Sequence, residues 1–93
     1  MNDPNIIENS DGTITIDGLT GLPMYVLYDH PLDYPSHYVV RPHLAAAKGG
    51  KAHASPNGFL FDTLQEARDF IPKGMVRVHR HPSDDSVIVE SYI

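Results

Sequence analysis

Cysteine is absent from this sequence of 93 residues, and so is any long apolar run. Without cysteine the chain has no disulfide, no thiolate zinc site and no cysteine nucleophile. A helix that spans a bilayer needs roughly 18–20 consecutive apolar residues, and no stretch of this sequence approaches that length. The segment from Met1 to Asn5 has neither the basic flank nor the apolar region of a secretory signal. We therefore expect a cytoplasmic protein without a membrane partner.

The composition is that of one small folded domain. Hydrophobic residues make up 41% of the chain and charged residues 20%, close to the averages of globular proteins. Compact domains usually contain about 100–150 residues, so a chain of this length has no room for a second independent core. We expect a single domain with an ordinary apolar interior.

Basic residues are few, with 7 Lys and Arg against 12 Asp and Glu, for a formal net charge of −5. The resulting field repels phosphate backbones, which makes nucleic acid an unlikely partner for the chain as a whole. The charges are unevenly placed, however. Residues 34–61 contain three bases and no acid, namely Arg41, Lys48 and Lys51. This basic segment keeps weak nucleic-acid binding open as an alternative.

The first half of the sequence predicts three extended units separated by turn residues. Residues 6–17 alternate around Asn-Ser-Asp-Gly and indicate a hairpin, and residues 18–23 then read as a connection. Residues 24–28 and 37–41 are rich in aromatic and β-branched side chains, which favour strands. A proline-containing turn joins them, so we expect antiparallel pairing, with Pro42 ending the second strand.

Residues 44–58 consist mostly of small residues, glycine and lysine and predict a flexible loop. Residues 58–61 follow as a short strand. Thr63 and Glu66 then form a capping-box pattern, and apolar residues at helical spacing predict one helix that ends before Pro72.

The last third of the sequence predicts two more strands. Residues 75–80 alternate apolar and polar side chains, which indicates one solvent-exposed face. Residues 87–93 are apolar on both faces at their start, which is typical of a central strand covered on both sides.

Together these elements predict an α+β fold: a small antiparallel sheet of four to six strands with one short helix packed on one face. We divide the chain into an N-terminal hairpin extension at 1–23 and a single small domain at 24–93, with its flexible loop at 44–58. One helix covers only one face of such a sheet. The other face must be solvated, covered by the hairpin, or buried in a homodimer.

Tyrosine is frequent and suits a surface that is partly apolar and partly hydrogen-bonding. We therefore predict a non-enzymatic protein-interaction or regulatory module that self-associates, as a homodimer, and binds a partner protein through a tyrosine-rich sheet face or an edge strand. The candidate contact residues are Tyr25, Tyr28, Tyr34, Tyr38 and Arg41.

Six histidines make metal binding the second alternative. His79 and His81 lie two residues apart, which on a strand places both imidazoles on one face, and Asp84 follows as a candidate oxygen ligand. Another set, Asp29, His30, Asp33 and His37, surrounds one turn, but aspartate before such turns also caps the backbone. No cofactor is expected from the sequence.

Catalysis has little support. Ser36-His37 and Ser83-Asp84-Asp85 contain residue types that catalyse, but neither has the glycine-flanked elbow that exposes a serine nucleophile. A domain with one helix also offers little depth for excluding water. We expect the protein not to be an enzyme.

Three stretches resemble a group of short uncharacterised bacterial and phage proteins. They are Tyr28-Asp29-His30-Pro31-Leu32-Asp33-Tyr34-Pro35 through Val39-Val40-Arg41, then Thr63-Leu64-Gln65-Glu66-Ala67-Arg68, and finally Asp84-Asp85-Ser86-Val87-Ile88-Val89-Glu90. The resemblance spans roughly residues 24–93 and omits both the hairpin and the 44–58 loop. It implies a compact stand-alone domain and carries no activity.

Overall fold

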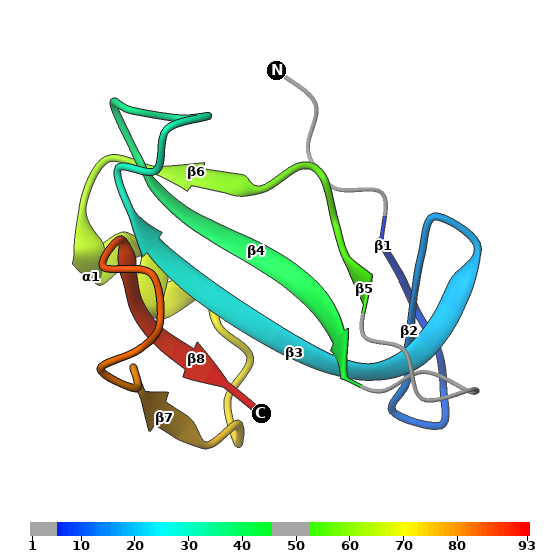
Figure 1. The fold of residues 1–93 in the computed structure, drawn as a ribbon. Helices are drawn as coiled ribbons and strands as arrows, with labels where there is room; N and C mark the ends of the chain where they lie inside the picture. The colour runs from blue at the N-terminus through cyan, green and yellow to red at the C-terminus, as the bar shows by residue number, and fades with distance from the viewer. Residues whose placement is uncertain (1–5, 46–52) are drawn as a thin grey trace.

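The computed structural model describes residues 6–45 and 53–93, which form an antiparallel sheet and one helix (Figure 1). The elements are β1 (Ile6–Glu8), β2 (Ile14–Ile16), β3 (Leu19–Asp29), β4 (Tyr38–Ala45), β5 (His53–Ala54), β6 (Phe59–Phe61), α1 (Leu64–Phe70), β7 (Arg77–His79) and β8 (Ile88–Tyr92). The small antiparallel α+β fold is confirmed. The expected strand number is wrong, because the described residues form eight strands rather than four to six.

β3 is the strand around which the sheet is built. Its first three residues pair with β2, residues 22–29 pair with β4 on one side, and residues 25–28 pair with β8 on the other. The antiparallel pairing of β3 with β4 confirms the arrangement expected from the sequence. β8 lies between β3 and β7, which confirms its interior position and leaves β7 on the outside of the sheet (Figure 1).

β3 is longer than the sequence predicted, because residues 19–23 belong to it instead of forming a connection. Asp17 and Gly18 have positive φ angles of 51° and 82° and make a tight reversal directly after β2. Thr20 therefore pairs with Thr15, and the N-terminal hairpin becomes part of the sheet.

Pro42 does not end β4, which continues to Ala45. The carbonyl of Pro42 accepts a hydrogen bond from the Ser55 N–H on the outer side of β4, and the missing N–H of the proline faces that same side. Between β6 and β5 the outer ladder is interrupted at this point, so the missing donor is tolerated. The predicted 44–58 loop is consequently shorter than expected, and residues 46–52 lie outside the described part of the chain.

The helix begins where the sequence predicted, directly after Thr63. The Thr63 hydroxyl accepts from the backbone N–H of Glu66 at 3.1 Å and donates to its carboxylate at 3.0 Å. The helix packs its apolar side, with Ala67 fully buried, onto the sheet residues Tyr25 and Leu27. Among the described residues there is no helix long and apolar enough to cross a membrane.

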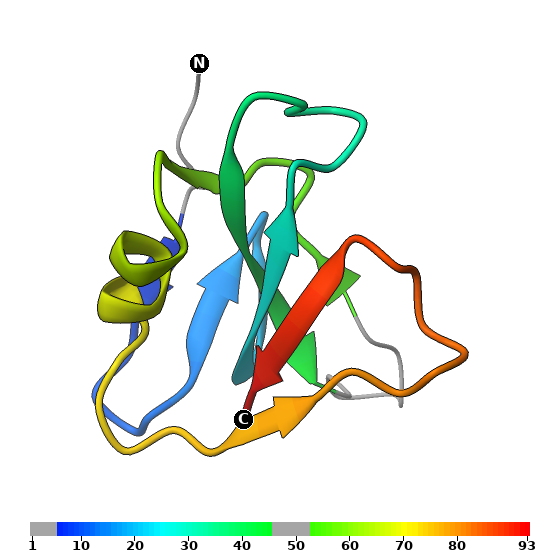
Figure 2. The same cartoon turned by 90° about the vertical axis from the view of Figure 1, so that its left-hand side faces the viewer.

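The hairpin covers the same face of the sheet as the helix (Figure 2). Its residues Ile14 and Ile16 pack on Leu44, which shares a face of β4 with Val40 beneath the helix. The opposite face of the sheet, which we call the open face, carries Val26 and Arg41. The hairpin therefore does not cover the second face. Part of that face is nevertheless buried by the chain itself, since Val26 is 5% exposed and Val39 0%.

Candidate functional site

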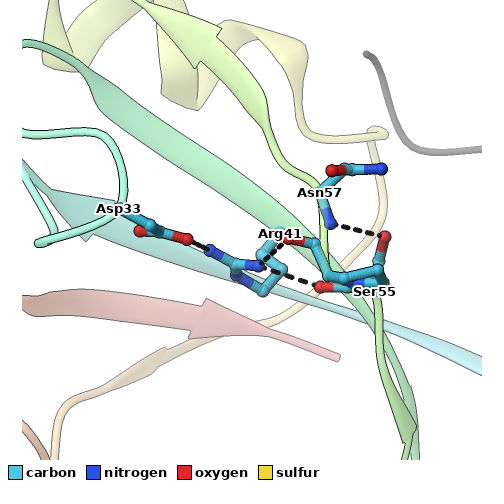
Figure 3. A network of polar contacts seen from close by, with 5 residues as sticks. Asp33, Arg41, Ser55 and Asn57 are labelled. Atoms are coloured by element: carbon cyan, nitrogen blue, oxygen red, sulfur yellow. Dashed lines mark hydrogen bonds and ion pairs between the residues drawn. The ribbon is translucent and has the colours of Figure 1, made fainter. Parts of the chain in front are cut away.

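Arg41 lies on the open face and joins three segments of the chain. Its Nη2 donates to Oδ2 of Asp33 at 2.5 Å, and its Nη1 donates to the backbone carbonyls of Ser55 at 3.0 Å and Pro56 at 2.8 Å (Figure 3). Only 13% of the arginine side chain is exposed. The planar guanidinium presents donors in several directions at once, so one side chain holds the β3–β4 turn and the segment after β5 against the sheet.

An open groove of about 620 Å³ adjoins Arg41 on this face. The Arg41 Cζ lies 5.6 Å from the centre of the Tyr28 ring. Burial raises the pKa of Tyr28; the Arg41 charge opposes this, and the carboxylates of Asp33 and Asp85 add to it. The groove is lined by Tyr28, Pro31, Leu32, Asp33, Arg41, Asp85 and Val87. Because three of the five N–H donors of Arg41 are engaged within the chain, we interpret this arginine as a residue that shapes the face.

The five predicted contact residues do not form one surface. Tyr25 is 5% exposed and packs in the core under the helix. Tyr38 packs at the margin of the same core, whereas Tyr28 and Arg41 lie on the open face and Tyr34 lies in the β3–β4 turn. Successive strand residues point to opposite faces, so positions 25 and 28 in one strand cannot share a surface. The tyrosine-rich face expected from the sequence is thus divided between the two sides of the sheet.

The candidate metal ligands His79, His81 and Asp84 are not brought together either. Oδ2 of Asp84 accepts from the backbone N–H of His81 at 2.9 Å, and Nδ1 of His81 lies 2.6 Å from Oγ of Ser83. These contacts cap a turn, which is the common role of aspartate in such a segment. Across residues 6–45 and 53–93, no three His, Asp or Glu side chains form a group that could hold a metal ion.

The second histidine and aspartate set, around the turn between β3 and β4, is divided among separate contacts. Asp29 pairs with His30, Asp33 pairs with the guanidinium described above, and Nε2 of His37 lies 3.8 Å from Oδ1 of Asp62. The carboxylates of this set serve as turn and ion-pair partners.

The outer strand β7 presents unpaired backbone groups. Val76 and Ile93 exchange two backbone hydrogen bonds of 2.7 and 3.0 Å, which fixes the phase of the β7–β8 ladder. In an antiparallel ladder hydrogen-bonded pairs alternate with non-bonded pairs, so Val78 bonds to β8 while Arg77 and His79 do not. The N–H and C=O groups of Arg77 and His79 therefore point away from β8, and within the described residues they have no backbone partner.

Apolar side chains are exposed beside this edge. Val76 is 63% exposed, Val78 41% and Ile93 58%. Val78 pairs with Ser91, so it lies on the open face, and Val76 and Ile93 share that face by alternation. We call these three residues the apolar strip. The sequence signal for it was the alternation over residues 75–80, which predicted the strand but not that its apolar side would remain exposed.

Comparisons with protein-family models, with curated proteins and with solved structures find no match to this chain.

Proposed function

We propose that this chain is a non-enzymatic protein-interaction module that adds an extended segment of a partner protein to its sheet along β7. The observation that supports this proposal is the outward row of backbone donors and acceptors of Arg77 and His79 beside the apolar strip. In strand addition, main-chain hydrogen bonds supply affinity and alternate side chains supply specificity. β7 offers both kinds of contact in one place.

A partner protein fits this edge better than a second copy of the chain. In the antiparallel register that uses all the outward groups of two β7 strands, Arg77 of one copy lies opposite His79 of the other. In this register neither Arg77 meets a carboxylate of the other β7 strand, whereas a different protein can present one. The homodimer expected from the sequence stays a prediction, and light scattering measures it directly.

A pair of substitutions at one position tests the proposal. His79→Pro removes the outward N–H but leaves the β7–β8 hydrogen bonds of Val78 intact, and proline is tolerated on edge strands whose N–H faces solvent. His79→Ala keeps the N–H and is the matched control. Peptides are first selected from a display library against the wild-type protein, and their affinities are then measured by calorimetry.

We expect His79→Pro to lose binding at least 10-fold, since one strand hydrogen bond and the approach of the ligand backbone are both lost. We expect His79→Ala to bind within about threefold of wild type. Far-UV circular dichroism checks that both variants are folded. Equal binding by the proline variant, or a selection that yields no ligand, would contradict strand addition at β7.

A further inference from the structure

We infer that the partner segment recognised at β7 alternates apolar and acidic side chains; this inference rests on the proposed function. The two faces of β7 carry different chemistry. Arg77 pairs with Tyr92, which pairs with Tyr25, so Arg77 and His79 lie on the helix-covered face of the sheet. The apolar strip lies on the open face. An added strand would thus have Arg77 and His79 on one side and an apolar row on the other.

The positive charge of Arg77 is only partly offset within the protein, by the buried carboxylate of Glu90. In residues 6–45 and 53–93, neither Arg77 nor Arg80 forms an ion pair, although the whole chain has a net charge of −5. Glu90 is the residue opposite His79, but it accepts hydrogen bonds from Arg68 and Tyr92. An acidic side chain on the ligand would therefore meet positive charge at this edge.

The register of the ligand strand follows from the hydrogen-bond pattern of β7. Paired residues in neighbouring strands share a face, so ligand residues opposite Arg77 and His79 lie beside these two side chains, and those opposite Val76 and Val78 extend the apolar strip. The two acidic positions are two residues apart, about 7 Å along the strand. Exposed valine and isoleucine beside Arg77 favour a peptide over a phosphate backbone, because an apolar strip gives a phosphate backbone nothing to bind.

Three blocked peptides test the inference. The first is Thr-Val-Glu-Val-Glu-Val-Thr, and the other two replace both glutamates by glutamine or by lysine. Affinities for the whole chain are measured by calorimetry at pH 7 in low salt. We expect the glutamate peptide to bind roughly 1.5- to 5-fold more tightly than the glutamine peptide, as one surface ion pair with Arg77 allows, and the lysine peptide to bind most weakly. The preference should shrink at about 1 M salt, where charges are screened beyond roughly 3 Å.

Two charge variants locate the effect. Arg77→Gln should abolish much of the preference for glutamate, whereas Lys73→Gln, which removes the same charge from an exposed turn, should leave it unchanged. If all three peptides bind equally and His79→Pro loses them, strand addition stands and the acidic preference is wrong. If no peptide binds, or His79→Pro binds them as wild type does, strand addition itself fails. Tighter binding of single-stranded DNA than of any peptide, lost in Arg77→Gln, would also overturn the inference.

Discussion

Glu90 of β8 accepts two hydrogen bonds from the guanidinium of Arg68 on α1, each 3.1 Å long. Glu90 is 2% exposed, and the hydroxyl of Tyr92 donates to the same carboxylate. Burial raises the pKa of Glu90, but the hydrogen bonds from Arg68 and Tyr92 outweigh it and leave the pKa below its ordinary value. This network joins the helix to β8, the strand that pairs with β7. Its loss should therefore lower the stability of the fold and loosen the β7 edge.

Glu90→Gln should destabilise the fold by about 1.5–3 kcal/mol, because it replaces charge-assisted hydrogen bonds with weaker ones and adds donors that lack acceptors. Urea unfolding followed by circular dichroism measures the change. Arg68→Met and the double variant complete a mutant cycle. Strictly additive effects of the two substitutions would show that the pair contributes no coupling.

Tyr92 should make the protein sensitive to alkali. Burial, followed by the hydrogen bond to Glu90, raises the pKa of Tyr92 to about 12 from an ordinary value of 10.0. A group whose pKa is raised on folding contributes stability that is fully present below its unfolded pKa and is lost as pH rises toward the folded one. The free energy of unfolding should therefore fall between pH 10 and about 12. Tyr92→Phe should flatten this part of the curve, and an identical slope in the variant would rule out Tyr92 as its origin.

Arg41→Lys should release the segments that the guanidinium holds. An ammonium is a point charge and cannot reproduce the fork that reaches one carboxylate and two carbonyls. We expect faster amide exchange at Asn57 and across the 30–37 turn, with a stability loss of about 1–3 kcal/mol. Asp33→Asn serves as the comparison, because it weakens only one of the three contacts. Unchanged exchange in the lysine variant would show that the network does not hold these segments.

Gly58→Ala should be destabilising although Gly58 has no unusual backbone angle. A Cβ at this position would overlap the Cγ1 of Val39, which is fully buried. Overpacking of this kind costs typically about 1–3 kcal/mol. Val39→Ala in the same chain should recover part of the loss by making room for the added methyl. Thermal unfolding of the two single variants and the double variant measures this, and a double variant as unstable as the sum of both would contradict the overlap.

Amide hydrogen exchange should show which N–H groups of β7 bond to β8 and which face outward. The N–H of Val76 bonds to Ile93, and the ladder assigns the N–H of Val78 to Ser91, whereas those of Arg77 and His79 face outward. We expect the amides of Val76 and Val78 to exchange at least 10-fold more slowly than those of Arg77 and His79. Peptide binding should then protect Arg77 and His79. Equal exchange along β7 would remove the basis of the proposed function.

Local chemistry made much of the fold predictable. The Thr63 cap, the hairpin around Gly12 and the pairing of β3 with β4 depend on neighbouring residues, and each was confirmed. The predictions that Pro42 ends its strand and that residues 18–23 form a connection were wrong. A proline or glycine breaks a strand only where the neighbouring strand needs the hydrogen bond or side-chain contact that it lacks. That need depends on strands far away in the sequence.

The amino-acid sequence alone determined the fold class, the position of the helix and an interior β8, since periodicity and turn residues act over a few positions. Only the tertiary structure decided that Tyr25 is buried and Tyr28 is not, that Arg41 is held by Asp33 and two carbonyls, and that the hairpin shares a face with the helix. It also decided that β7 lies at an edge of the sheet. Whether a backbone group is paired depends on what lies beside it in space, and the alternation of residues 75–80 reads the same for an inner strand and an outer one.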